Sequence, residues 1–341
     1  MNRHNLPGQG LTTAMGIMPH TDLQAALQIA LSLDIPFWPQ LPRMSYYEDM
    51  YAQASEKFPG LTVDTAQERI AFDTAKFYEE LPLYFQECET PGFYELSPQY
   101  SLAFQGFLSQ NLENYPVIRG QNVGPVSFGF KITDENRRPI LYNDEIREFL
   151  FDFIAAKTNA QYQQLQAKHP QALVWLDEPG LQMLFSSYTG YTTTAAARDY
   201  REFLDKLAGP KGVHLCGNID WSFLLTDLDL DILSLDSYSV GHIFTRYKDE
   251  VVAFLRKGGI IAWGITPTLT EEIAEETEDK LVKRLQDMFS YLTAQGISLA
   301  DILERSWFAP SRCCLVNPDR TKSVEQSLAL LKNVARRIVN G

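Results

Sequence analysis

The chain has 341 residues, 30 of them basic and 43 acidic, which gives a formal net charge of −13, and 45% of its residues are apolar. The negative charge and the lack of a basic run exclude a typical nucleic-acid-binding surface, and the apolar content excludes a disordered chain. No apolar run approaches the roughly 18 residues that a membrane span requires. Residues 1–11 are polar and lack the apolar core of a signal peptide, so we expect neither nucleic acid nor a membrane as a partner.

Strand-like and helix-like segments alternate along the chain. Short apolar runs predict strands at 11–17, 35–39, within 116–130 (ending near 124–128), 173–177, 212–216, 231–236, 259–263 and 306–309. Apolar residues at helical spacing predict helices at 22–33, 144–168, 194–207, 248–257, 276–295 and 321–339. Eight candidate strands, most of them followed by a helix, favour an α/β fold, a single (β/α)8 TIM barrel over 1–341. The alternative is an open doubly wound sheet, but the chain has no G-x-G-x-x-G motif, P-loop or internal repeat.

One long segment, 43–110, interrupts this alternation. It is rich in Tyr and Phe and predicts a helical insertion of helices and loops over one end of the barrel, near the N-terminal third. Two interpretations stay open for it. The segment is either a docking surface or lid, or a set of extra helices packed on the barrel.

The chain has few cysteines for its length, at positions 88, 216, 313 and 314. Four thiols are too few for a disulfide framework in so large a protein, and this favours a reducing, cytoplasmic location. In that compartment clustered thiols indicate metal binding or catalysis.

The candidate metal ligands stand at predicted strand ends, where barrel enzymes have their active sites. His214 and Cys216 are two residues apart on a strand, so their side chains point to the same face. A further thiolate, from Cys313 or Cys314 after the last strand, would give a His plus two Cys set that suits zinc. Asp236 is a candidate fourth ligand that substrate would displace. The alternative is that all of these are buried structural residues.

Two carboxylates, Asp177 and Glu178, end another predicted strand. A carboxylate beside a zinc site could hold the ammonium group of a substrate. A carboxylate at a strand end also often caps the next helix, so a structural role is the alternative.

Five short segments occur in a definite order: Thr12–Pro19 (TTAMGIMP), Gly124–Ser127 (GPVS), Trp175–Leu181 (WLDEPGL), His214–Cys216 (HLC) and Cys313–Leu315 (CCL). Together they resemble the motifs TTxIGSFP, GPVT, QxDEPAL, HxC and CGL of the catalytic zinc barrel of cobalamin-independent methionine synthase, within the uroporphyrinogen-decarboxylase-like superfamily. The resemblance covers most of the chain and is poorest over 43–110. It implies a short, single-barrel member of that family.

The resemblance implies roles for the residues at these positions. The zinc ligands would be His214, Cys216 and Cys313, with Cys314 as a competitor because Arg312 lengthens the last segment by one residue; Asp236 stands about where the family has a ligand Glu. Asp177 would hold the homocysteine amino group beside Glu178, within a pocket that also includes Met15, Gly16 and Ile17. Ile17 replaces the family's Ser.

A second departure bears on the methyl donor. The family has D-x-H-S-P after its seventh strand, with a His that assists transfer from folate, whereas this chain has Trp263–Pro267 with Ile265 in the His position. Methyl folate is a poor donor without a proton for its leaving nitrogen, and a methyl-cobalt corrinoid needs no such proton. We therefore expect a zinc-dependent methyltransferase that moves a methyl group from methylcobalamin, or from a corrinoid protein, to homocysteine, giving methionine.

Other functions stay open at this point. The acceptor could be another thiol, such as coenzyme M, in a zinc methyltransferase of the same superfamily. The chain could also be a porphyrin decarboxylase, although that family uses arginines near the N-terminus and only Arg3 and Arg43 occur in the first 65 residues. A non-catalytic zinc protein or corrinoid shuttle is the third alternative.

Overall fold

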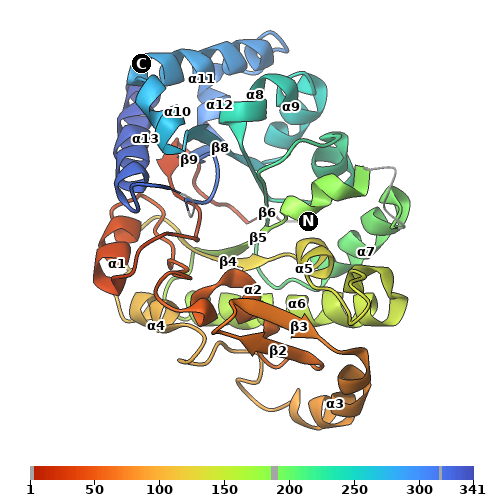
Figure 1. The fold of residues 1–341 in the computed structure, drawn as a ribbon. Coiled ribbons are helices and arrows are strands. Elements are labelled where there is room, and N and C mark those ends of the chain that lie inside the picture. Colours follow the sequence, from red (N-terminus) through yellow and green to blue (C-terminus); the bar gives the residue numbers. More distant parts are fainter. Residues whose placement is uncertain (1–3, 186–190, 315–316) are drawn as a thin grey trace.

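The computed structural model describes residues 4–185, 191–314 and 317–341, and its centre is a curled sheet of parallel strands (Figure 1). Within these ranges seven strands pair in the order β1-β9-β8-β7-β6-β5-β4. Their bounds are β1 Leu11–Thr12, β4 Ile118–Val123, β5 Ala172–Asp177, β6 Lys211–Leu215, β7 Ile232–Leu235, β8 Ile260–Thr266 and β9 Ser306–Pro310. The order from β9 to β4 follows the sequence without the reversal that defines a doubly wound sheet. The predicted α/β class is therefore confirmed, with a curled parallel sheet.

The segment 35–40 lies between the two edge strands of this sheet. It makes single parallel bridges to both sides, from Gln40 to Ile17 and from Phe37 to Arg119. Two prolines within the segment have no backbone N–H to donate, which explains why the predicted strand 35–39 forms only isolated bridges. Closure into an eight-stranded barrel stays a prediction.

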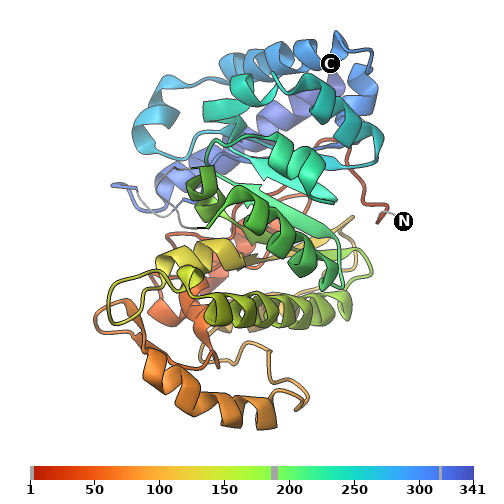
Figure 2. The ribbon, with the colours of Figure 1, turned by 90° about the vertical axis from the view of Figure 1, so that its right-hand side faces the viewer.

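Helices cover the outside of the curled sheet (Figures 1 and 2). Their bounds are α1 Leu23–Leu31, α5 Pro125–Lys131, α6 Asp144–Gln166, α7 Thr193–Asp205, α8 Ser237–Phe244, α9 Lys248–Arg256, α10 Thr270–Glu275, α11 Glu278–Thr293, α12 Leu299–Glu304 and α13 Lys322–Asn340. The six predicted helices correspond to α1, α6, α7, α9, α11 and α13. Short helices such as α10 and α12 were not predicted, because six residues hold fewer than two turns of apolar periodicity. No described helix combines the length and apolarity that crossing a bilayer needs.

The prediction of a strand that ends near 124–128 is wrong in its boundary. The strand β4 ends at Val123, and residues Pro125–Lys131 form α5. Gly124 is the N-cap of this helix and Pro125 its first residue, a position where a missing N–H costs nothing. The GPVS motif is therefore a strand-to-helix turn at the carboxyl end of the sheet.

Apolar side chains pack in two layers, one inside the curled sheet and one between the sheet and the helices. Along β8, Ile260 and Ala262 belong to the inner layer, whereas Ile261, Trp263 and Ile265 belong to the outer layer. This alternation is expected for a strand with successive side chains on opposite faces. The buried residues of the inner layer are Leu6, Met15, Ile35, Val117, Leu173, Trp175, Ile232, Ile260, Ala262 and Trp307.

The segment 43–110 contains more than the predicted helices and loops. It forms α2 Met50–Ser55, an antiparallel hairpin of β2 Leu61–Asp64 and β3 Arg69–Phe72, and then α3 Thr74–Glu87 and α4 Leu102–Leu108. The hairpin is a correction to the sequence prediction. Its strands have only four residues each and are mostly part-exposed, so they lack the apolar run that marks the strands of the main sheet.

The aromatic residues of this segment pack against α6. The Phe58 ring lies 5.2 Å from Phe149 and 5.0 Å from Phe153, measured between ring centroids. The buried Lys157 of α6 donates a hydrogen bond to the Glu56 carbonyl at 3.1 Å. Packing on the main fold therefore accounts for much of the aromatic content, and a lid or docking role stays a prediction.

Candidate functional site

The predicted site residues on β5, β6 and β7 line up along the carboxyl edge of the sheet. In the strand register Asp177 is opposite His214, and His214 is opposite Ser234. Cys216 and Asp236 each follow the last residue of their strand, β6 and β7. The structure thus places these polar residues of three neighbouring strands at one rim.

His214 is fully enclosed at this rim. Its Nδ1 lies 2.9 Å from Ser234 Oγ, and its Nε2 is buried without a hydrogen-bond partner among the described residues. Burial and the charge of Arg119 lower the pKa of His214 to about 3, so the imidazole is neutral. In the tautomer that donates its Nδ1 proton to Ser234, Nε2 presents a lone pair, the state in which histidine binds metals.

Cys216 lies among negative groups. Burial raises the pKa of the Cys216 thiol to about 12, and the charges of Asp177, Cys313 and Asp236 act in the same direction. The thiol is therefore protonated at neutral pH unless a cation binds to it and stabilises the thiolate. Because the charge of Cys313 acts on Cys216, the two thiols share one neighbourhood, although they come from distant parts of the chain.

The two adjacent cysteines after β9 face different surroundings. Cys313 packs against both layers, while Cys314 is buried in the outer layer alone, where burial raises the pKa of its thiol. Cys313 is therefore the better placed of the two to meet Cys216 at the rim. Leu315, the last residue of that motif, lies outside the described residues.

Within the described ranges, no group of three or more His, Cys, Asp and Glu side chains is arranged to hold a metal ion. The donor chemistry fits zinc nonetheless, because a buried imidazole nitrogen without a partner and two nearby thiols are soft ligands. A buried polar atom that lacks a hydrogen bond costs free energy, so a ligand for His214 Nε2 would compensate that cost.

Asp236 is already engaged by protein groups. It is the N-cap of α8, where its Oδ1 accepts a hydrogen bond from the Ser239 N–H at 2.9 Å. Its Oδ2 lies 3.6 Å from Nε of Arg312, whose Nη2 also donates to both carboxylate oxygens of Glu272, at 2.7 and 2.8 Å. The structure thus gives Asp236 a structural partner on each oxygen, and a role as fourth ligand would require Arg312 to move.

Glu178 joins two of the sequence motifs. Its fully buried carboxylate accepts hydrogen bonds from Val126 N (3.2 Å), Ser127 N (2.8 Å) and Ser127 Oγ (2.5 Å), which are the first residues of α5. Burial raises the pKa of Glu178 to about 7, and these hydrogen bonds oppose that shift. A Cβ atom at Gly124 would overlap the Glu178 side chain, so the turn needs glycine there for lack of space. Glu178 therefore fixes the turn rather than facing the mouth of the sheet.

Asp177 is the carboxylate that remains unsatisfied. Its Oδ1 is buried without a hydrogen-bond partner among the described residues. Burial raises the pKa of Asp177 to about 7, and the nearby Arg119 opposes this shift. An unpartnered carboxylate oxygen at the rim is suited to accept a hydrogen bond from a substrate cation.

Arg119 was not predicted from the sequence. This β4 residue is completely buried, its guanidinium lies 3.6 Å from the centre of the Trp175 ring, and it donates hydrogen bonds to Thr13 Oγ1 (3.2 Å) and the Ala14 carbonyl. The sequence feature that could have indicated Arg119 is a single basic residue in an otherwise uncharged strand. Arg119 sets a positive charge beneath Asp177.

The three predicted substrate-loop residues have different surroundings. Met15 belongs to the inner layer, and Ile17 belongs to the outer layer. A Cβ atom at Gly16 would overlap the Gln121 side chain, so glycine permits close packing of the loop on β4. Of the two side chains, only that of Met15 therefore faces the inside of the sheet.

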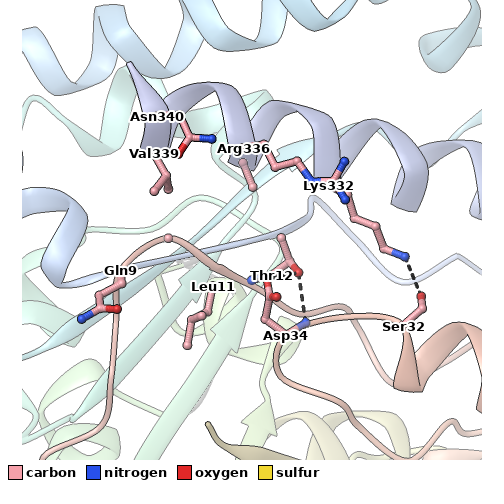
Figure 3. Close-up of a pocket in the computed structure, with 11 residues that line it drawn as sticks. Gln9, Leu11, Thr12, Ser32, Asp34, Lys332, Arg336, Val339 and Asn340 are labelled. Atoms are coloured by element: carbon pink, nitrogen blue, oxygen red, sulfur yellow. Dashed lines mark hydrogen bonds between the residues drawn. The ribbon is translucent and has the colours of Figure 1, made fainter. Parts of the chain in front are cut away.

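A cavity of about 250 Å³ lies elsewhere, at the amino end of β1 (Figure 3). Segment 9–12, the residues after α1 and the last turns of α13 line it. Lys332 donates a hydrogen bond to Ser32 Oγ at 2.7 Å, and the Thr12 hydroxyl donates one to Asp34 at 2.7 Å. None of the predicted site residues lines this cavity. The amino ends of barrel strands serve stability rather than chemistry, so we place the candidate site at the opposite rim.

No protein-family model matches the chain, and no curated protein matches its sequence. Among solved structures, a methyltransferase from Methanosarcina mazei is similar with a TM-score of 0.59 and 11% identity, over 97% of this chain and 94% of that one. A B12-independent methionine synthase from Shewanella sp. W3-18-1 matches with a TM-score of 0.41 and 15% identity, over 65% of this chain and 62% of its own. The first match indicates a shared fold, and the second is too weak to support a conclusion.

The contact between Gly124 and Glu178 can be tested by a double-mutant cycle. Gly124→Ala should lower the free energy of unfolding by about 1–3 kcal/mol, because the new methyl group displaces the Glu178 side chain. In a Glu178→Ala background the same substitution should cost at least about 1 kcal/mol less, since the overlapping atoms are gone. Urea unfolding of the four proteins measures both differences.

Gly106→Ala on α4 is the control, because its added Cβ would meet Leu27 and not Glu178. Its effect should be the same in both backgrounds. An equal cost of Gly124→Ala in both backgrounds would contradict the packing role of Gly124.

Proposed function

We propose that this chain is a zinc-dependent methyltransferase that transfers a methyl group to a thiol, with zinc held by His214, Cys216 and Cys313. The observation that carries the proposal is the Nε2 atom of His214, buried and without a partner among the described residues, two residues before Cys216 at the carboxyl end of β6. Homocysteine is the acceptor we favour, which makes methionine the product.

The fold supports a place in the uroporphyrinogen-decarboxylase-like superfamily. The similarity to the Methanosarcina mazei methyltransferase extends over nearly the whole chain, at the level of fold. We propose further that segment 35–40, bridged to Arg119 of β4 on one side and to Ile17, after β1, on the other, occupies the eighth position of a single (β/α)8 barrel. The rim that holds the candidate site is then the usual catalytic face of such a barrel.

The proposed zinc ligands differ in whether they must lose a proton before they bind the metal. Zinc, when bound, would lower the pKa of an acceptor thiol so that its thiolate exists near neutral pH. His214 is held in place by Ser234 and stays neutral because of its burial. Cys216 and Cys313 would have to lose their protons when the metal binds. Asp236 is left out of this set, because Ser239 and Arg312 already engage its oxygens.

Asp177 is the residue we assign to substrate recognition. Its buried Oδ1 would accept a hydrogen bond from the ammonium group of an amino-acid thiol. Glu178 acts indirectly, because its hydrogen bonds hold the start of α5 against the end of β5, where Asp177 stands.

The surroundings of Ile265 bear on the methyl donor. Its side chain is completely buried in the outer layer, away from the inside of the sheet. It can neither donate nor relay a proton to a leaving nitrogen, whereas a corrinoid leaves without protonation. We therefore propose methylcobalamin or a corrinoid protein as the donor.

Metal analysis tests the ligand set. The purified protein should hold one zinc ion per chain, and Cys216→Ser should reduce this well below one without loss of helical circular dichroism. Cys88→Ser is the matched control, because Cys88 is the C-cap of α3 in the inserted segment, where its thiol meets the Phe85 carbonyl and the Tyr94 hydroxyl. A Cys216→Ser protein that retains one zinc ion per chain would show that the assignment is wrong.

Steady-state kinetics test the role of Asp177. Asp177→Asn removes the negative charge and should raise the KM for homocysteine roughly tenfold to hundredfold, because a charge-assisted hydrogen bond is worth about 1.5–3 kcal/mol. The KM for a thiol that lacks an amine should change much less. Equal increases for both thiols would make Asp177 a structural residue.

Separate supply of each donor tests the corrinoid assignment. With homocysteine and zinc, methylcobalamin should yield methionine, while methyltetrahydrofolate should be nearly inert because its leaving nitrogen finds no proton at Ile265. Removal of zinc by a chelator is the control and should stop the methylcobalamin reaction. Efficient methionine formation from methyl folate without any corrinoid would refute the assignment.

A further inference from the structure

Tyr51 comes from the inserted segment and stands beside the candidate site. It is the second residue of α2, whose N-cap Asp49 accepts hydrogen bonds from the N–H groups of Tyr51 (2.8 Å) and Ala52 (3.2 Å). Its ring stacks on Phe128 of α5, with centroids 6.2 Å apart and planes at 19°. Figure 1 shows α2 beside β4, and the two elements pack together. The ring is therefore held near the strand-to-helix turn that Glu178 fixes.

The Tyr51 ring stacks on α5, and its hydroxyl lies within electrostatic range of the acidic groups of the site. The negative charges of Asp177, Glu178, Asp49 and Cys216 all act on it and, with burial, raise the pKa of Tyr51 well above its usual value. The hydroxyl is therefore a protonated donor at any physiological pH. It donates to none of the described residues, although carboxylates lie near it.

The Tyr51 hydroxyl donates to no described residue, and the buried Asp177 Oδ1 accepts from none, so together they indicate a ligand that carries a donor and an acceptor. The buried Asp177 Oδ1 lacks a donor among the described residues, and the protonated Tyr51 hydroxyl can donate to a ligand. Ile17 supplies no such donor, because its side chain is apolar and packs in the outer layer. A neutral hydroxyl also suits this place better than a second cation, which would pair with Asp177 and compete with the substrate.

We infer that Tyr51 is a substrate-binding residue whose hydroxyl donates a hydrogen bond to the anionic oxygen group of the acceptor thiol, a carboxylate or a sulfonate. This inference rests on the proposed thiol methyltransferase function. It gives the inserted segment a part in the active site. In an amino-acid thiol, Asp177 would bind the ammonium group and Tyr51 the carboxylate. In a sulfonate thiol, Tyr51 alone would bind the charged group. The carbon chain of the substrate then extends toward Cys216.

The test compares wild type with Tyr51→Phe, a substitution that retains the ring and its stacking on Phe128. Zinc-loaded protein and methylcobalamin are supplied with homocysteine, with 2-mercaptoethanesulfonate or with an aminoalkyl thiol, 3-aminopropane-1-thiol, which has no anionic group. Tyr51→Phe should raise the KM for the anionic thiol that the wild type uses roughly tenfold to hundredfold. The KM for the aminoalkyl thiol should be unchanged. Tyr47→Phe is the control, because the Tyr47 ring packs on Tyr100 within the insertion; it should alter neither value.

Calorimetric titration of each thiol into both proteins separates two kinds of failure. If the wild type binds an anionic thiol and Tyr51→Phe leaves its affinity unchanged, or weakens all three thiols equally, the role of Tyr51 is refuted and the proposed function stands. If the wild type neither binds nor methylates any of the thiols, the proposed function fails and this inference fails with it. Selective loss of the anionic thiol, by either measurement, supports the assignment.

Discussion

The burial of the Glu178 carboxylate is the interaction on which the candidate site depends. A carboxylate removed from water is costly unless hydrogen bonds replace its hydration, and here the start of α5 supplies them. The N-terminal end of a helix also favours negative charge. This arrangement fixes the end of β5 against the turn after β4, and it is possible only because Gly124 has no side chain. The neighbouring Asp177 and the stacking surface for Tyr51 are positioned by the same contact.

Two other polar groups of the site have a buried atom that lacks a hydrogen-bond partner in the described part of the chain. His214 Nε2 and Asp177 Oδ1 are buried without partners among the described residues, whereas Arg119 beneath them has its donors largely occupied by carbonyl and hydroxyl oxygens. Proteins rarely leave such atoms unsatisfied, and functional sites are a common exception. The unsatisfied atoms are a nitrogen and a carboxylate oxygen, which suit a metal ion and a substrate cation. The Arg119 charge offsets part of the cost of an ionised Asp177.

Local patterns made much of the fold predictable. The strands β5 to β9 and the long helices follow from short apolar runs and from helical spacing, both of which are readable within one segment. The strand predicted within 116–130 exists, but its predicted end near 124–128 is wrong because Pro125 begins a helix. The rim residues were predictable because parallel strands bring their carboxyl ends together. The contact of Glu178 with Gly124, and the positions of Arg119 and Tyr51, join residues far apart in the chain and leave no periodic signal.

The seam at segment 35–40 has a consequence for the motions of the molecule. From β4 to β8, each pair of neighbouring strands shares a ladder of four to six residue pairs. Segment 35–40 is held on each side by a single bridge and a few backbone hydrogen bonds, such as the one from the Arg119 N–H to the Pro36 carbonyl at 2.9 Å. Cooperative opening begins where the fewest hydrogen bonds must break together. Amide hydrogens along this seam should therefore exchange with solvent before those of β5 to β8. Local opening of the curled sheet would then begin along segment 35–40, next to the start of the inserted segment 43–110.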